Sequence, residues 1–141
     1  MKQRSVARKI SLFLFVISTL FTAFFVVSAI IAYPSTEAIP PIIVSIVLAA
    51  DWGLIDYHYF TCYRYLGSPE SNDIQAKRKL QNRNTVLAAI MAGITFCSLI
   101  PLLYFLAIYR VNLGLLQHIF GIPAGISLLY AICTLLINKA I

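Results

Sequence analysis

The chain has 141 residues, of which 60% are hydrophobic and 11% charged, and its mean hydropathy is +0.86. Soluble domains carry about 25% charged residues, so this composition excludes an ordinary soluble domain and indicates a surface that faces lipid. The net charge of +6 is compatible with nucleic-acid binding, but the cations lie where membrane topology requires them, and we expect no nucleic-acid partner.

The chain begins with a basic head, residues 1–9, followed by the apolar stretch 10–32. A bilayer span needs ~20 apolar residues, so this stretch predicts the first transmembrane helix. A secretory signal has the same order of charged and apolar segments, but its apolar part is usually about 7–15 residues long. Because 10–32 is longer, we expect a retained membrane anchor.

Residues 33–38 form a predicted short outer turn, and residues 39–61 the second span, with Pro40 and Pro41 in its first turn. Proline is well placed there, since the first amides of a helix have no intrahelical partner. The second half of this span is unusually polar.

A predicted cytoplasmic connection, residues 64–84, follows the second span. Within it, Asn72 and Gln75 have the spacing of a capping box. We therefore expect a helix that starts near Asp73 and continues without interruption into the third span, at about 85–109.

A tight outer turn at 110–112 leads to the fourth span, about 113–137, which contains the sequence F-G-I-P-A-G. Gly121 and Gly125 form a GxxxG pair, which lets another backbone approach closely. Pro123 lies between them, and a proline inside a helix leaves the carbonyl four residues earlier without its amide partner. That carbonyl belongs to Ile119, so the sequence predicts an interrupted span.

The cations are distributed unequally between the two sides of such a four-span chain. Cytoplasmic loops carry an excess of Lys and Arg, and here only Arg110 falls on the opposite side. The other ten are Lys2, Arg4, Arg8, Lys9, Arg64, Lys77, Arg78, Lys79, Arg83 and Lys139. The predicted fold is all-α and polytopic: one domain, residues 1–141, with four transmembrane helices in an antiparallel bundle and both termini cytoplasmic. The expected location is the plasma (inner) membrane.

Asp51 is the least expected residue of the second span. The twelve residues from Ile39 to Ala50 reach about 18 Å as a helix, whereas the hydrocarbon core is ~30 Å thick. The carboxylate is therefore predicted to lie inside the apolar layer, where such groups usually face a bundle interior or a wet cavity and mark a pathway. A structural role, in which Asp51 bonds to a neighbouring helix, is an equal alternative.

Three further residues could act together with Asp51. Helical spacing places His58 on the same face as Asp51, and Asp56 on the adjacent face with Trp52. The carbonyl of Ile119, freed by Pro123, is predicted at a depth similar to that of Asp51. These groups form a possible ion- or substrate-binding site, although His58 and Asp56 are more typical of helix-interface residues and the fourth span of helix packing.

Other features concern partners. Gly121, Gly125 and Gly93 are candidate packing positions for a homo-oligomer or for other membrane subunits. Anionic lipid headgroups are the expected partners of the cations Lys77, Arg78, Lys79 and Arg83.

Enzyme motifs such as GxxxxGK[ST], HExxH and GxSxG are missing from the sequence, as is any CxxC pair. We therefore expect no enzyme activity, cofactor or metal.

The first functional hypothesis is a small transport-type protein that moves a cation, a proton-coupled solute or a lipid-linked group, with an intramembrane carboxylate. The alternative hypothesis is a non-catalytic accessory, assembly or protective subunit of a larger membrane complex. A lipid-modifying enzyme is a distant third hypothesis.

Overall fold

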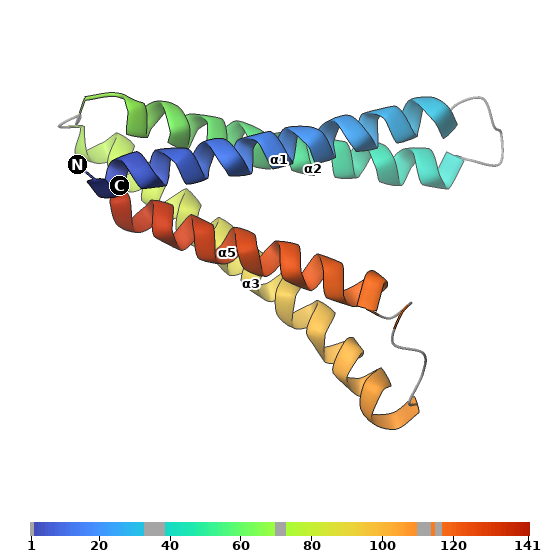
Figure 1. The fold of residues 1–141 in the computed structure, drawn as a ribbon. Helices are drawn as coiled ribbons and strands as arrows, with labels where there is room; N and C mark the ends of the chain where they lie inside the picture. Colours follow the sequence, from blue (N-terminus) through green and yellow to red (C-terminus); the bar gives the residue numbers. More distant parts are fainter. Residues whose placement is uncertain (1, 33–38, 70–72, 110–113, 115–116) are drawn as a thin grey trace. The chain divides into compact units, whose positions relative to one another are not determined.

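The structure, a computed structural model, describes residues 2–32, 39–69, 73–109, 114 and 117–141. The regular elements in this part of the chain are helices: α1 (Lys2–Ala32), α2 (Ile39–Gly67), α3 (Ile74–Tyr109), η2 (Gln117–Gly121) and α5 (Ile122–Ala140) (Figure 1). Four of the described helices are long and apolar enough to cross a membrane. The chain is thus a small, all-helical, multi-pass membrane protein. It divides into two compact units, Met1–Ser71 and Asn72–Ile141.

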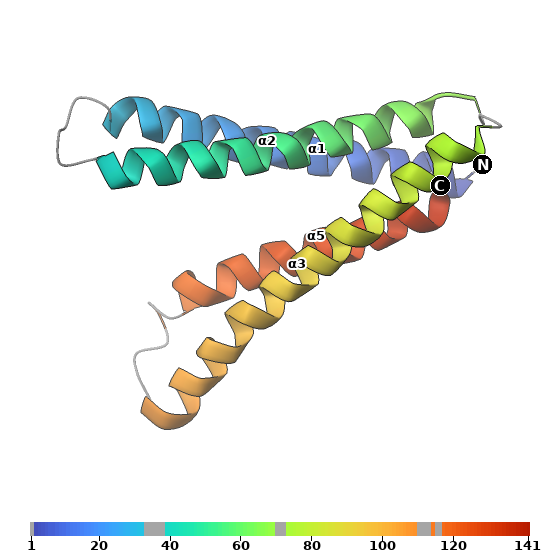
Figure 2. The same cartoon turned by 180° about the vertical axis from the view of Figure 1, so that it is seen from behind.

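In the first unit, α1 packs along α2, and the two lie side by side in both views (Figures 1 and 2). The buried positions of α1 recur every three or four residues, which places them on one face of the helix. They are Ala7, Ser11, Leu14 and Ser18, and Tyr59, Cys62 and Leu66 are the buried positions of α2. Most of the α1 positions are small, and small residues let two helices approach closely. We call this contact the α1–α2 seam.

The second unit is formed by α3 and α5, joined by a short buried hydrogen bond. The hydroxyl oxygens of Thr95 and Ser127 are 2.7 Å apart across this contact. Around them lie small or flexible buried side chains, namely Ala88 and Met91 on α3 and Ala124 and Ala131 on α5. This α3–α5 seam therefore combines small residues and one hydroxyl pair with larger buried side chains such as Tyr130 and Ile137.

The start of α3 agrees with the sequence prediction. The side chain of Asp73 accepts hydrogen bonds from the backbone amides of Gln75 (3.0 Å) and Ala76 (3.1 Å), which satisfies two of the free amides at a helix start. Asn72, the expected capping residue, lies outside the described residues. From Ile74 the helix continues without interruption to Tyr109, past Pro101.

Helices α1 and α2 extend beyond the apolar stretches that predicted them. α1 begins at Lys2 rather than near residue 10, and α2 ends at Gly67 rather than at 61. Nothing in these basic segments breaks a helix until Gly67 is reached, so the backbone hydrogen bonds continue into the polar region. Lys and Arg are good helix formers, which explains why the ends of the apolar layer and the ends of the helices differ.

The interruption of the fourth span takes the form of a π-helical turn. Residues Gln117–Gly121 form this turn, and α5 begins directly after it at Ile122. Pro123 is therefore at the start of α5, where a proline is tolerated, and no kink in the middle of a helix is needed. The wider π turn changes the carbonyl positions before the proline ring, which would clash with the i−4 carbonyl of a regular α-helix.

Candidate functional site

Asp51 lies level with the middle of the apolar part of α1. Phe21, at the centre of the stretch 10–32, stacks on Trp52 with 4.6 Å between the ring centroids. Asp51 is the neighbour of Trp52 along α2. The first unit therefore carries a carboxylate halfway along its apolar length; its depth in a membrane stays a prediction.

The Asp51 side chain lies off the α1–α2 seam. It is exposed and makes no hydrogen bond or ion pair with any residue that the structure describes. Five residues separate it from Asp56, which corresponds to a rotation of about 140° around the helix. Because Asp56 faces α1, Asp51 is directed to another side of α2.

Asp56 is bonded across the seam. The Thr19 hydroxyl oxygen lies 2.7 Å from a carboxylate oxygen of Asp56 and 2.9 Å from the carbonyl oxygen of Phe15. A hydroxyl has one proton and two lone pairs, so Thr19 donates to one of these oxygens at a time. The neighbouring α1 residue thus gives Asp56 a polar partner within the apolar part of the unit.

His58 lies on the same side of α2 as Asp51, about 10 Å nearer the basic end of the helix. Its Nε2 atom is 3.6 Å from the sulfur of Cys62, and its ring meets the ring of Tyr59 edge to face, with centroids 5.4 Å apart. Cys62 and Tyr59 are buried. The imidazole is therefore anchored at the border of the seam and partly exposed.

The predicted residues of the fourth span lie in the second unit. Ile119 belongs to the π-helical turn and is exposed. The carbonyl of Pro123 accepts a hydrogen bond of 2.8 Å from the hydroxyl of Ser127. Since Asp51, Asp56 and His58 belong to the first unit, the predicted meeting of Asp51 with the Ile119 carbonyl stays a prediction.

The glycines expected to support helix packing are open within their own unit. A Cβ atom added to Gly93 or Gly125 would meet nothing within 4 Å, and Gly121 is half-buried. Inside the unit, α3 and α5 meet through other small residues, such as Ala124 and Ala131. Helix packing through Gly93 or Gly125 would therefore involve contacts outside this pair of helices.

Sequence reasoning missed a contact between the start of α1 and the end of α2. A guanidinium nitrogen of Arg4 donates to the backbone carbonyls of Tyr65 (3.3 Å) and Ser68 (3.5 Å). Both carbonyls lie at or just beyond the C-terminal end of α2, where a cation is favoured by the helix dipole.

Arg8, one turn along α1, adds to the same contact. It donates to the Tyr63 hydroxyl at 3.2 Å and lies over that ring, 4.7 Å from its centroid. Gly67 leaves room for it, since a Cβ atom there would lie 2.9 Å from the guanidinium carbon. We call this set of contacts the arginine clamp; the spacing of four between two arginines was its signal in the sequence.

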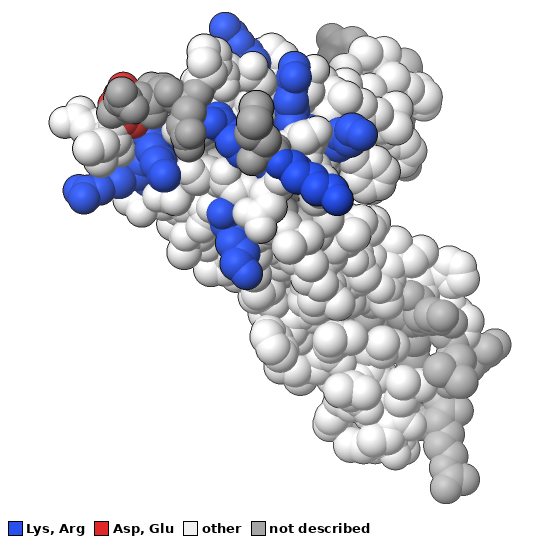
Figure 3. All heavy atoms as spheres, turned by 60° about the vertical axis from the view of Figure 1, so that its left-hand side comes forward, with Lys and Arg blue, Asp and Glu red and all other residues white. Residues whose placement is uncertain are grey.

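The cations of the first unit are concentrated at this end: Lys2, Arg4, Arg8 and Lys9 begin α1, and Arg64 lies near the end of α2. Lys and Arg side chains are coloured blue in the space-filling view of Figure 3. Among the described residues, no group of three His, Cys, Asp or Glu side chains could hold a metal ion.

Comparisons with protein-family models, with curated proteins and with solved structures find no match to this chain. What defines the class of the protein is thus its own architecture: a small multi-pass membrane protein with four apolar helices.

Proposed function

We propose that this chain is a small transport-type membrane protein in which Asp51 is the ionisable centre. The cargo class is a cation, a proton-coupled solute or a lipid-linked group. The observation that carries the proposal is the position of Asp51, which lies halfway along the apolar part of the unit but off the seam. A carboxylate placed at the centre of a span costs about 2.5–3.5 kcal/mol on insertion scales, and the α1–α2 seam does not offset this cost.

Asp56 and His58, two further polar residues of α2, support the same chemistry. Thr19 serves Asp56 in either charge state, because a hydroxyl donates to a carboxylate and accepts from a carboxylic acid. His58, aligned with Asp51 towards the basic end, carries an imidazole, a side chain that commonly relays protons in proteins. Together these groups provide steps for a proton or cation between the middle of the span and the cytoplasmic side that the sequence predicts.

The test is flux across a membrane with the full chain reconstituted in liposomes. A dye trapped inside the liposomes reports proton entry after a potassium diffusion potential is imposed, and sodium and potassium fluxes are measured in parallel. Asp51→Asn is expected to abolish the flux with unchanged incorporation into the liposomes, whereas Asp51→Glu, which keeps the carboxylate, is expected to retain part of it. Equal flux in the wild type and Asp51→Asn would contradict the proposal.

A second candidate function, an accessory or assembly subunit of a larger membrane complex, is favoured by a different observation. Gly93 and Gly125 leave open backbone on the surface of the second unit, and open glycines are typical contact points between transmembrane helices. In this case Asp51→Asn preserves function, while Gly121→Leu or Gly125→Leu destroys assembly. Purification in mild detergent distinguishes the two: larger subunits that co-purify favour the accessory role, and a homo-oligomer alone favours transport.

A further inference from the structure

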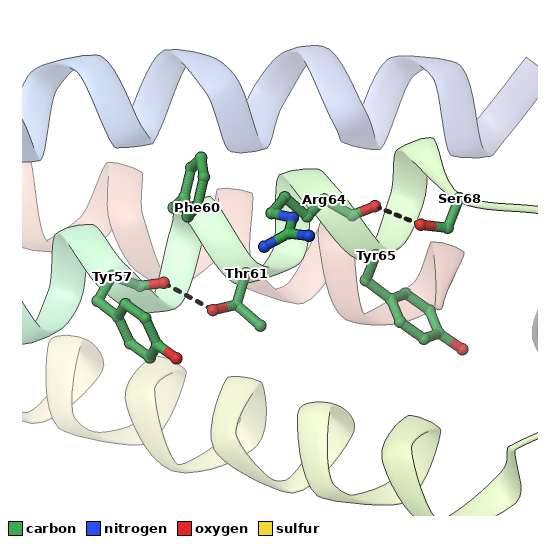
Figure 4. Close-up of a pocket in the computed structure, with 6 residues that line it drawn as sticks. All are labelled: Tyr57, Phe60, Thr61, Arg64, Tyr65 and Ser68. Atoms are coloured by element: carbon green, nitrogen blue, oxygen red, sulfur yellow. Dashed lines mark hydrogen bonds between the residues drawn. The ribbon is translucent and has the colours of Figure 1, made fainter.

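A hollow on one side of α2, near its C-terminal end, has the composition of an anion site. It is lined by Tyr57, Phe60, Thr61, Arg64, Tyr65 and Ser68. Figure 4 shows the side chains of Tyr57, Thr61 and Tyr65 on the same side of the helix, with the Arg64 guanidinium among them. Arg64 also obeys the charge rule for membrane topology, and it has no role in the proposed transport.

The strongest hydrogen-bond donors that line this hollow make no hydrogen bond to a described residue. The Arg64 guanidinium lies 5.9 Å from the centroid of the Phe60 ring and makes no hydrogen bond to a described residue. The hydroxyls of Tyr57 and Tyr65 likewise have no partner in the described part of the chain, and Tyr57 is 64% exposed. Thr61 and Ser68, by contrast, donate to carbonyls of their own helix, at 2.8 and 3.0 Å.

The electrostatic surroundings favour a negative ligand. The hollow has no acidic lining residue, and Asp56, one of the two acidic residues of α2, is bonded to Thr19 on α1. Arg4 and Arg8 are nearby cations, but the clamp occupies them at the end of α2. Arg64 is thus the cation that remains available to a ligand in the hollow.

The depth of the hollow matches a lipid rather than a soluble ion. Arg8 contacts Tyr63, so the adjacent Arg64 lies level with the basic residues that precede the apolar stretch of α1. Tyr57, seven residues earlier, lies about 10 Å deeper along the helix axis. The hollow therefore has a charged end at headgroup level and an aromatic end among the acyl chains.

We propose that this hollow binds the phosphate of an anionic phospholipid, with Arg64 as the principal ligand and the hydroxyl of the adjacent Tyr65 as an additional donor. The planar guanidinium presents paired N–H groups that match two phosphate oxygens, and such charge-assisted pairs are the strong hydrogen bonds of proteins. The aromatic end then packs against the first part of an acyl chain. The proposal is independent of Asp51 and of transport.

The experiment counts bound lipid by native mass spectrometry of the full chain in detergent. Phosphatidylglycerol and phosphatidylcholine with identical acyl chains are titrated separately, because both carry a phosphate but only the first has a net negative charge. We expect phosphatidylglycerol to bind several-fold more tightly. Arg64→Gln should weaken its binding about tenfold, in line with the loss of a charge-assisted contact, and Arg64→Lys should fall between.

Lys9→Gln is the matched control, because Lys9 is an exposed cation of the same unit that does not line the hollow. It should leave the tight binding unchanged, and Tyr65→Phe should weaken it by a smaller factor than Arg64→Gln. Equal losses in Lys9→Gln and Arg64→Gln would overturn the proposal, because they would indicate a diffuse charge effect. Displacement of the lipid by inorganic phosphate at millimolar concentration would also overturn it, since the site would then accept a soluble anion. Helicity measured by circular dichroism verifies that the Arg64 variants are folded.

Discussion

The Thr19 hydroxyl lies 2.7 Å from a carboxylate oxygen of Asp56, and this bond joins the two helices of the first unit within their apolar part. Asp51, five residues earlier on the same helix, has no such partner among the described residues. The two carboxylates therefore differ in the helix face they occupy, and this difference leads to opposite expectations for their substitution.

Thr19→Val is expected to destabilise the first unit by about 1–3 kcal/mol, because the near-isosteric change leaves a polar group in an apolar place without its partner. The unfolding of the purified protein in mixed micelles, followed by circular dichroism as the share of denaturing detergent rises, measures this loss. Thr19→Ser keeps the hydroxyl and should remain near the wild type. A Val variant as stable as the Ser variant would show that the bond contributes nothing.

Asp51→Leu and Asp56→Leu are a matched pair on one helix. Both should favour insertion of the isolated α2 segment by up to about 3 kcal/mol, because each removes a carboxylate from the apolar layer. Glycosylation mapping in microsomes reports this insertion equilibrium. In the full chain only Asp56→Leu should reduce the stability of the first unit, since only Asp56 is bonded to α1. A similar loss in Asp51→Leu would mean that Asp51 has a structural partner.

Ala124→Leu and Gly125→Leu are neighbouring substitutions with different expected results. Ala124 is 5% exposed in the α3–α5 seam, so a larger side chain there overpacks the contact, which typically costs about 1–3 kcal/mol. Gly125 is open, so the pairing of α3 with α5 should tolerate leucine. Cysteine pairs introduced across the seam and cross-linked in membranes measure this pairing. Loss of cross-linking in both variants would contradict the assignment of the seam.

Arg4→Gln is expected to lower the stability of the first unit by about 0.5–1 kcal/mol, the usual contribution of a cation at a helix C-terminus. Detergent unfolding measures the change, and Lys2→Gln serves as the control because Lys2 is exposed at the same end of α1. The loss should shrink at high salt, where exposed charges are screened. Equal effects of the two substitutions would indicate a change in net charge rather than the loss of the clamp.

Much of the helical architecture follows from the sequence by simple arguments. The lengths of the apolar stretches predict four spanning helices. The spacing of Asn72 and Gln75 predicts a helix start near Asp73, and α3 begins at Ile74. The antiparallel arrangement of all four helices and the cytoplasmic position of both termini stay predictions. Reporter fusions at each end would test the termini.

The site was harder to predict for physical reasons. Helical periodicity separates Asp51 and Asp56 into two faces, but it does not say which face meets α1, because both faces carry aromatic residues. The π-helical turn before Pro123 was not predicted either, since apolar composition does not distinguish a π turn from an α turn. The arginine clamp was missed because its cations also satisfy the charge rule for membrane topology.

The arginine clamp also has a consequence for how the protein is made. Arg4 and its acceptor carbonyl on Tyr65 are 61 residues apart in the chain, so the first arginines leave the ribosome well before their counterparts exist. The contacts between Arg4 and the end of α2 can form only after α2 has been synthesised, so the clamp closes after both helices of the first unit exist.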